Sequence, residues 1–559
     1  MTQHRMARAV RRPRRALLVA ASVVAAGSLT LTACTGGGTP AAEGAEFDFT
    51  GKEVGAMSDY GVDTTFVASE PVEFGLFYRD HPNYPITDDW LILDELKTNQ
   101  KVSFDVVSAP LSEWDQRKSL VIGAGDAPDI VSVTYPGQEV AFVAGGAILP
   151  ASDFVQYMPN YLDKVEKWGL EPDLDQLRQE DGKYYLFPGF REEPRPEYSF
   201  AVRSDIWQQL GLSLEPATFD ELRDQLETVK KAYPDLYPMT DRWSANGPIE
   251  GTLGFVAPNF GTAAGWGFGQ GLTWDGDAFV YTGATDEYKD LVAFYASLVE
   301  DGLLDPEAIT QDDDQAKQKV ASGRALSVGT NNQEIITYRQ TLKDLGTAGD
   351  LALIRVPAGP AGDYVAAGQR LVSGFMLSAK AKDKPYFKAL LQFVDWLYYS
   401  DEGLEFAKWG VEGQTFTTDA DGTRVLDPSI TAMGINPGAP KNLQADFGFS
   451  NGVWMLVHGS TVDLDRSMLP EEALTFVEAM STKEVMELPP PAPLSEIERE
   501  QVTLYQSALK DHVSQNTAAF ILGQRPMSEW DAYVQELQGL NVTEYLSVMN
   551  EAQKRFAAR

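Results

Sequence analysis

Apolar positions recur with two different periods after residue 70. Residues 72–78 (VEFGLFY) form a short apolar run, and residues 101–108 (KVSFDVVS) alternate polar and apolar side chains, as strands do. Residues 88–97 (DDWLILDELK), which lie between them, have helical spacing. A strand, a helix and a strand in succession are the building unit of a parallel sheet. The pattern therefore predicts an α/β fold.

The same alternation continues along the chain. Residues 114–122 have helical spacing, which ends at a stretch containing glycine and proline, and residues 130–133 resume an apolar strand. No internal repeat is visible. The proline-rich run at residues 489–493 (PPPAP) predicts a surface crossing between helices.

The first 34 residues have a different pattern. A basic stretch with six arginines precedes an apolar run at residues 16–26, and the only cysteine of the chain, Cys34, follows in the sequence LTAC. These are the charged and apolar regions of an export signal, and LTAC resembles a bacterial lipobox. We therefore expect residues 1–33 to be a lipoprotein signal peptide and Cys34 to carry a diacylglyceryl group on the extracytoplasmic face of the cell membrane.

Two other interpretations of this terminus stay open, namely an ordinary secretory signal with an incidental cysteine and a signal anchor that remains in the membrane. The apolar run is shorter than the roughly 18 to 20 residues of a spanning helix, which disfavours the anchor. Residues 34–69 are small, polar and acidic with little periodicity, which predicts a flexible tether.

Composition narrows the class of protein. A formal net charge of −35 repels nucleic acid phosphates, so we expect no nucleic acid partner. A hydrophobic content of 43% is typical of a globular protein, and a single cysteine excludes an intramolecular disulfide. The length of the chain favours two or more hydrophobic cores.

Motifs for catalysis are sparse. The histidines, His4, His81, His458 and His512, lack zinc-binding spacing, and the sequence contains neither a nucleophile elbow nor a phosphate-binding glycine loop. A glycoside hydrolase needs only two facing carboxylates, and 81 acidic residues leave that class open.

Aromatic residues in a glycine-rich segment offer another chemistry. Residues 259–271 (NFGTAAGWGFGQG) place Phe260, Trp266 and Phe268 among glycines, and Trp274 follows. Flat apolar rings suit the CH faces of sugars. We predict that Phe260, Trp266 and Trp274 contact a ligand, and Trp243 is equally compatible with the core. Other tryptophans, at helical apolar positions, are expected in the core: Trp114, Trp168, Trp207, Trp396 and Trp530.

Several segments together resemble the family 1 extracellular solute-binding proteins of ABC importers. In the N-terminal half these are residues 114–130 (WDQRKSLVIGAGDAPDI), 145–150 (GGAILP) and 181–188 (DGKYYLFP). Matches at residues 203–212, 218–230, 388–403, 410–416 and 521–556 are similar to a long subgroup that includes alginate-oligosaccharide-binding lipoproteins.

The resemblance implies a two-lobe, periplasmic-binding-protein-like fold of type II, in which each lobe is a mixed sheet flanked by helices. Crossings expected near residues 195, 360 and 410 give lobe one residues 70–195 and 360–409, and lobe two residues 196–359 and 410–559. The cleft is then lined by loops that follow strands. This implies further ligand contacts from Arg79, Tyr84, Tyr135, Asn331 with Asn332, Arg370 and Glu412.

No cofactor or metal is expected. Some members of the subgroup carry a calcium loop where this chain has residues 237–250, but this stretch supplies only Asp241 and Asn246 as side-chain ligands. Asp419 to Gly422 predicts a hairpin turn rather than a metal loop. Asp312, Asp313 and Asp314 predict the solvated first turn of a helix.

The function that these features predict is capture of a carbohydrate, in particular an oligosaccharide, by lobe closure and its delivery to an ABC importer. The expected partners are the carbohydrate, the permease subunits and the membrane through the lipid anchor. We expect a monomer without enzymatic activity. An anchored, exported glycoside hydrolase and a peptide-binding lipoprotein are the alternatives.

Overall fold

The computed structural model describes residues 46–241, 247–368, 370–455 and 459–559. The chain divides into two units, residues 1–47 and residues 48–559, and all helices and strands described below belong to the second. Cys34, the signal peptide, Trp243 and His458 lie outside the described residues. Among the residues that are described, no helix is long and apolar enough to cross a membrane.

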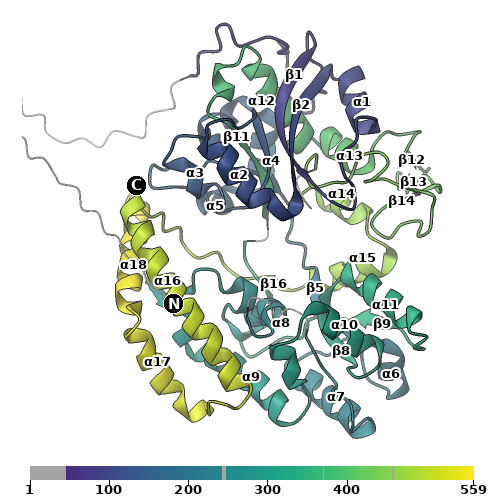
Figure 1. Ribbon diagram of the computed structural model, residues 1–559, viewed down its shortest axis with the longest axis vertical. Coiled ribbons are helices and arrows are strands. Elements are labelled where there is room, and N and C mark those ends of the chain that lie inside the picture. The colour runs from purple at the N-terminus through teal and green to yellow at the C-terminus, as the bar shows by residue number, and fades with distance from the viewer. Residues whose placement is uncertain (1–45, 242–246, 369, 456–458) are drawn as a thin grey trace, which may run out of the picture. The chain divides into compact units, whose positions relative to one another are not determined.

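The first lobe is built on a five-stranded sheet with the order β2-β1-β3-β11-β4 (Figure 1). Strand β1 lies between β2 and β3 and pairs parallel with both, with Val72 opposite Val102 and Leu76 opposite Ile130. Strand β11 runs antiparallel between β3 and β4. The predicted parallel sheet is therefore confirmed, and the bounds are β1 Val72–Asp80, β2 Val102–Pro110, β3 Ile130–Thr134, β4 Phe187–Phe190 and β11 Leu371–Leu377.

Helices cover this sheet because their apolar faces need burial. The most buried is α12 (Phe387–Tyr399), in which every residue except Lys388 is buried. Its apolar residues on all sides are typical of a helix enclosed by protein. The other helices of the lobe are α1 Leu91–Thr98, α2 Trp114–Gly123, α3 Val140–Val143, α4 Pro159–Trp168, α5 Glu171–Asp175 and α13 Asp401–Trp409.

The segment before β1 is packed against this lobe from Asp48 onward. The Tyr60 hydroxyl donates to Asp395 at 2.9 Å, and the backbone N–H of Met57 donates to Gln392 Oε1 at 2.9 Å. Phe66 is fully buried. The predicted tether, residues 34–69, is therefore too long at its C-terminal end. Its low periodicity concealed contacts with α12, which lies more than 300 residues further along the chain.

Residues after α13 also pack on the first lobe. The Trp90 indole N–H donates to the Ala445 carbonyl at 2.8 Å, and the Tyr398 hydroxyl donates to the Val453 carbonyl at 2.9 Å. This corrects the prediction that the second lobe begins at residue 410. The elements here are β12 Phe416–Thr418, β13 Arg424–Leu426, β14 Ile430–Thr431, β15 Lys441–Asn442 and α14 Val462–Ser467.

The turn predicted at Asp419 joins β12 and β13, which pair antiparallel. The Asp419 carboxylate accepts from the backbone N–H groups of Asp421 and Thr423 at 3.0 and 2.9 Å. These side-chain acceptors stabilise the turn, and the prediction of a hairpin is confirmed.

The second lobe contains a sheet with the order β8-β5-β9, and its strand pairs are antiparallel. A parallel bridge between Thr240 and Val328 makes the sheet mixed. The strands of this sheet are β5 Tyr198–Arg203, β8 Ser327–Asn331 and β9 Leu351–Leu353. Two small strand pairs lie outside it: β6 Leu272–Trp274 with β7 Phe279–Tyr281, and β10 Tyr364–Val365 with β16 Glu484–Val485.

Helices surround this second sheet. Asp312 caps the helix α10 and forms a capping box with Gln315, so the predicted helix start is confirmed. The helices are α6 Ser204–Gln209, α7 Phe219–Ala232, α8 Glu250–Val256, α9 Asp286–Glu300, α10 Asp313–Ala321, α11 Glu334–Asp344 and α15 Glu471–Met480. Three C-terminal helices share the core of this lobe: α16 Glu496–Ile521, α17 Trp530–Gln538 and α18 Val542–Ala557 (Figure 1).

The chain crosses between the lobes in three places. The first crossing joins β4 to β5 near Arg195. The second crossing lies between Tyr364 and β11. Tyr364 still belongs to the second lobe, because its backbone N–H donates to Asn259 Oδ1 at 3.0 Å. The third lies between α14 and α15. The boundaries predicted at residues 360 and 410 are therefore too early, since the contacts that decide them come from distant segments.

Candidate functional site

A cavity of about 580 Å³ is lined by residues of both lobes. The first lobe contributes the turn after β3 and the segment after α5. The second contributes the end of the glycine-rich segment, the proline-rich run and one face of α16. The lining residues that matter most are Pro136, Glu139, Gln179, Phe268, Pro489 and Arg499.

The wall from the first lobe is a tight turn that follows β3. The Gln138 N–H donates to the Tyr135 carbonyl at 3.0 Å, and Gly137 has a φ of +92°. The Gln138 side-chain oxygen accepts from the Tyr135 N–H at 3.2 Å and from the Lys118 ammonium at 2.9 Å. Lys118 thus stabilises the turn through its hydrogen bond to Gln138.

Lys118 is itself a buried cation on α2. Its ammonium lies 3.5 Å from the Asp115 carboxylate and 5.8 Å from the centre of the Trp114 ring. Burial lowers the pKa of Lys118, while Asp115 acts in the opposite direction. The sequence assigned no role to this lysine, because its burial depends on the packing of α2 against β3.

Glu139 stands at the end of the same turn and is only 1% exposed. Neither of its carboxylate oxygens has a hydrogen-bond partner among the described residues. Burial raises the pKa of Glu139 to about 7, against the effects of the nearby backbone N–H groups and the Lys118 ammonium. A carboxylate in this position is an unused acceptor at the cavity wall.

Each lobe contains a β-branched residue with a strained backbone. Val133, the fourth residue of β3, has a φ of +44°, and Ile249, which precedes α8, has a φ of +38°. A positive φ is costly for a β-branched residue and is frequent at ligand sites. The Trp114 indole N–H donates to the Val133 carbonyl at 3.1 Å and helps to hold this conformation.

The wall from the second lobe is the 3₁₀ turn η5 (Gly265–Phe268), which lies against α8. A Cβ atom at Gly265 would lie 1.9 Å from the Glu250 carbonyl oxygen. Glycine is therefore required for the turn to approach the helix so closely. This is the physical reason for the glycines in the segment.

Trp266 is held in this turn with 41% of its surface exposed. Its ring meets that of Tyr198 edge to face, with the ring centres 4.5 Å apart. The next aromatic, Phe268, is buried, packs near Tyr281 and Tyr288, and lines the cavity. An exposed, held indole beside the cavity can pack on an apolar ligand face.

The proline-rich run, whose residues are exposed or half-buried and lead into α16, lines the cavity as well. The Gln176 amide donates to the Pro489 carbonyl at 2.9 Å, and the Arg499 guanidinium on α16 donates to Gln179 Oε1 at 3.3 Å. These bonds connect the first lobe to the second beside the cavity. In the sequence, only the high proline content distinguished this segment from its neighbours.

Of the ligand contacts that the sequence predicts, Tyr135 and Trp266 directly precede the lining residues Pro136 and Gly267, which lie in opposite lobes. Tyr84 stacks on His81 with ring centres 4.2 Å apart, and Tyr135 and Arg79 are near enough to influence the pKa of Tyr84, which burial raises. The predicted residues at the ends of β1 and β3 are thus brought together.

Other predicted contacts are placed elsewhere. Phe260 is buried against Phe219 and Phe294, so it is a core residue of the second lobe and not a ligand contact. Trp274 is half-buried and packs on Phe279, which lines the cavity. Glu412 is exposed in the loop before β12, which packs with the first lobe.

Arg370 and Asn331 serve local structure. Arg370 lies 3.8 Å from the Asp173 carboxylate and donates to the Arg191 carbonyl at 3.4 Å, which ties β11 to the first crossing. The Asn331 side-chain oxygen accepts from the backbone N–H groups of Gln333 and Glu334 at 3.0 and 2.9 Å. Neither residue lines the cavity between the lobes.

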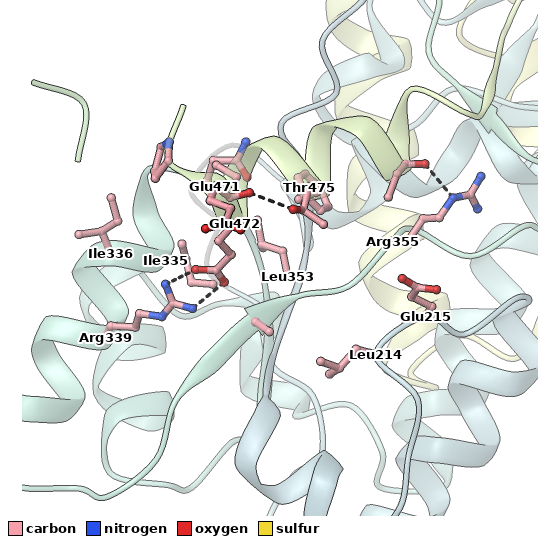
Figure 2. Close-up of a pocket in the computed structure, with 16 residues that line it drawn as sticks. Leu214, Glu215, Ile335, Ile336, Arg339, Leu353, Arg355, Glu471, Glu472 and Thr475 are labelled. Atoms are coloured by element: carbon pink, nitrogen blue, oxygen red, sulfur yellow. Dashed lines mark hydrogen bonds and ion pairs between the residues drawn. The ribbon is translucent and has the colours of Figure 1, made fainter. Parts of the chain in front are cut away.

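A second cavity of about 470 Å³ lies within the second lobe, between α11 and α15 (Figure 2). Its wall contains Asn332, Ile335, Ile336 and Leu353, and the Arg339–Glu472 ion pair, with N and O 2.6 Å apart, spans it. The Arg355 guanidinium donates to the Ala479 carbonyl at 3.0 Å. Because this cavity has no residue from the first lobe's sheet, a ligand there would not join the two lobes.

Metal ligands do not gather in the described part of the chain, where no group of three or more histidine, cysteine or acidic side chains could hold an ion. The side chains that line the cavity between the lobes offer hydrogen bonding, by Gln179 and Arg499, and aromatic packing, by Phe268.

The chain is similar to known proteins over most of its length. A family model described as bacterial extracellular solute-binding protein matches residues 83–403. The chain is 22% identical over 546 residues to the fructooligosaccharide ABC transporter substrate-binding protein FusA of Streptococcus pneumoniae, and the alignment covers 91% of this chain and 95% of that protein.

Solved structures share the arrangement of lobes. One is the HMO-binding, ABC-transporter-associated solute-binding protein of Bifidobacterium longum infantis, with a TM-score of 0.64, 20% identity and coverage of 87% of this chain and 99% of that one. Another is the alginate-binding protein AlgQ2 without calcium ion, with a TM-score of 0.63, 18% identity and coverage of 88% and 99%. At these identities the likeness establishes the two-lobe α/β fold.

Proposed function

Because the chain belongs to the bacterial extracellular solute-binding protein family, as the resemblance of its motifs predicted, we propose that it captures an oligosaccharide between its lobes and delivers it to an ABC importer. The observation that carries the proposal is the cavity with walls from both lobes. A ligand in this cavity contacts Pro136 or Glu139 on one side and the turn that contains Gly267 and Phe268 on the other.

Carbohydrate is the ligand class that this wall suits best. The exposed face of Trp266 offers an apolar plane for the CH face of a sugar ring, and carboxylate and tyrosine groups offer hydrogen bonds to hydroxyls. The names of the relatives support the same class, since they bind fructooligosaccharides, HMO and alginate. The names of FusA and the HMO-binding protein also include an ABC transporter, which supports delivery to an importer.

Capture occurs by rotation of the lobes about the three crossings. Adjacent crossing segments allow a hinge motion that leaves both cores intact. Only a ligand with different affinity for the open and closed states shifts the balance between them. A sugar that contacts both lobes satisfies this condition and closes the protein.

The anchor in this proposal is the lipid on Cys34. Stable membrane attachment takes two hydrocarbon chains, and a diacylglyceryl group supplies them. The second unit of the chain begins at Asp48, so residues 35–47 lie between it and the modified cysteine in the sequence. The protein would then work as a monomer on the extracytoplasmic face of the cell membrane.

The proposal is tested with the purified protein and panels of glycans and peptides in calorimetry, followed by mass analysis of the glycan after incubation. We expect a glycan to bind and to be recovered unchanged. Turnover of the glycan would support the glycoside hydrolase alternative, and binding of peptides alone would support the peptide-binding alternative. Either result would overturn the proposed function.

A further inference from the structure

The unpartnered carboxylate of Glu139 calls for a physical explanation. It is 1% exposed, and both of its oxygens lack a hydrogen-bond partner among the described residues. Leaving a buried acceptor unsatisfied costs about 1–3 kcal/mol, and more for a charged group. Glu139 lines the cavity between the lobes, and its oxygens are covered in the described structure, so a group that enters the cavity and uncovers them is the partner we consider.

The turn that carries this side chain is held in place before any ligand arrives. The preceding residue, Gln138, is bound by Lys118 and by the backbone of Tyr135, and α3 begins directly after Glu139. A polar group on a turn fixed in this way loses less conformational entropy when it binds. Its position can therefore discriminate between ligands.

The cations around Glu139 are engaged elsewhere. Lys118 on α2 pairs with Asp115 and binds Gln138, and Arg79 lies close enough to Lys118 to influence its pKa. On the other walls, Arg178 pairs with Asp175 at 2.6 Å, and Arg499 donates to Gln179 and to the Leu494 carbonyl. None of these groups forms an ion pair with Glu139.

We propose, on the basis of the function proposed above, that Glu139 determines specificity for an uncharged sugar by accepting hydrogen bonds from two of its hydroxyl groups. An ionised carboxylate only accepts hydrogen bonds, and neighbouring sugar hydroxyls donate them in the spacing that its two oxygens fit. The carboxylate of a uronic acid at this position would add a second negative charge and be repelled.

The first experiment compares Glu139→Gln with the wild type in calorimetry, with four probes: kestose, a neutral human milk tetrasaccharide, an alginate trisaccharide and a chitosan trisaccharide. Glutamine keeps the size of the side chain and removes its charge and one acceptor. We expect a neutral probe to bind best and to lose affinity about tenfold or more in the variant. Glu166→Gln, the same change at an exposed site on α4, is the matched control and should bind as the wild type does.

The second measurement is the pH dependence of the wild type, which does not depend on a folded variant. Hydroxyl donors favour the ionised form of Glu139, so binding should release protons and tighten as the pH rises from about 6 to 8, given the raised pKa. In Glu139→Gln this dependence should be lost.

The outcomes separate the two proposals. Best binding of the alginate or chitosan probe, equal affinity of Glu139→Gln and wild type, or a pH-independent wild type would overturn the role of Glu139 and leave glycan capture standing. Failure of all four glycans to bind the wild type would overturn both proposals.

Discussion

The indole of Trp266 rests directly on Gly254 of α8. A Cβ atom at position 254 would lie 2.1 Å from Trp266 Nε1, well inside contact distance. The exposed ring is therefore positioned by a missing side chain on a neighbouring helix. This relationship makes the geometry of the ligand wall sensitive to a single methyl group.

Gly254→Ala should displace the ring. We expect the free energy of unfolding to fall by about 1–3 kcal/mol, because the added methyl group overpacks the contact, and affinity for the glycan to fall as well. Gly123→Ala at the end of α2, where no atom lies within 4 Å of the added carbon, is the control. Wild-type affinity in Gly254→Ala would show that the position of Trp266 does not matter.

Trp266→Ala tests the aromatic wall itself. Loss of the packing face should weaken glycan binding by about 1 kcal/mol or more, while the stability changes less because the ring is 41% exposed. Titration calorimetry and thermal unfolding measure the two effects. Leu120→Ala, which removes an apolar side chain that is 62% exposed on α2, should change neither.

The raised pKa of Glu139 predicts a pH-dependent stability. Its usual value is 4.5 and the folded value is about 7, so its contribution favours folding while it is protonated. That contribution is present below about pH 4.5 and is lost as the pH rises through about 7. In the absence of ligand, the stability of Glu139→Gln relative to wild type should therefore rise over this range, by up to about 3 kcal/mol.

Denaturant unfolding of wild type and Glu139→Gln at several pH values measures the difference in their free energies of unfolding. The contributions of all other titratable groups cancel in this difference. The difference in free energy of unfolding between Glu166→Gln and wild type should not change with pH, because the Glu166 side chain is exposed. If the difference between Glu139→Gln and wild type is also independent of pH, the carboxyl group of Glu139 titrates normally in the folded protein.

Cys34→Ser tests the proposed anchor. The variant should appear in the soluble fraction or keep its signal peptide, because serine has no thiol to accept the diacylglyceryl group. Cell fractionation and the mass of the mature protein measure this. Membrane association of the variant at wild-type mature size would rule out the lipid anchor.

Ligand-induced closure predicts a change of shape in solution. Small-angle scattering of the soluble protein should give a smaller radius of gyration when the cognate glycan saturates it. A glycan of equal size that does not bind serves as the control. Saturation without any change in scattering would indicate a rigid cavity in place of a hinge.

Much of the fold could be predicted because it depends on local pattern. The strands β1, β2 and β3 and the helices between them follow from periodicity over short stretches, and short connections place such strands side by side. The caps and turns at Asp312 and Asp419 follow from side chains that bind their own backbone. The family followed from the order of several motifs, and the match over residues 83–403 confirms it.

Boundaries between the lobes needed the tertiary structure. Residues 416–455 carry no signal that they pack on the first lobe, since their partners, such as Trp90 and Tyr398, lie far away in the sequence. The same holds for the segment of Tyr60, whose partner Asp395 belongs to α12. Local composition alone predicted a tether there.

The sequence by itself determined the fold class, the family and the glycine-rich segment with its aromatics. Only the tertiary structure decided that Phe260 belongs to the core while Trp266 stays exposed, and that Glu139 is a buried carboxylate without a partner. The physical reason is that burial and hydrogen bonding depend on every neighbour in space. The wall opposite Glu139 is built by Pro489 and Arg499, which lie more than 300 residues away in the chain.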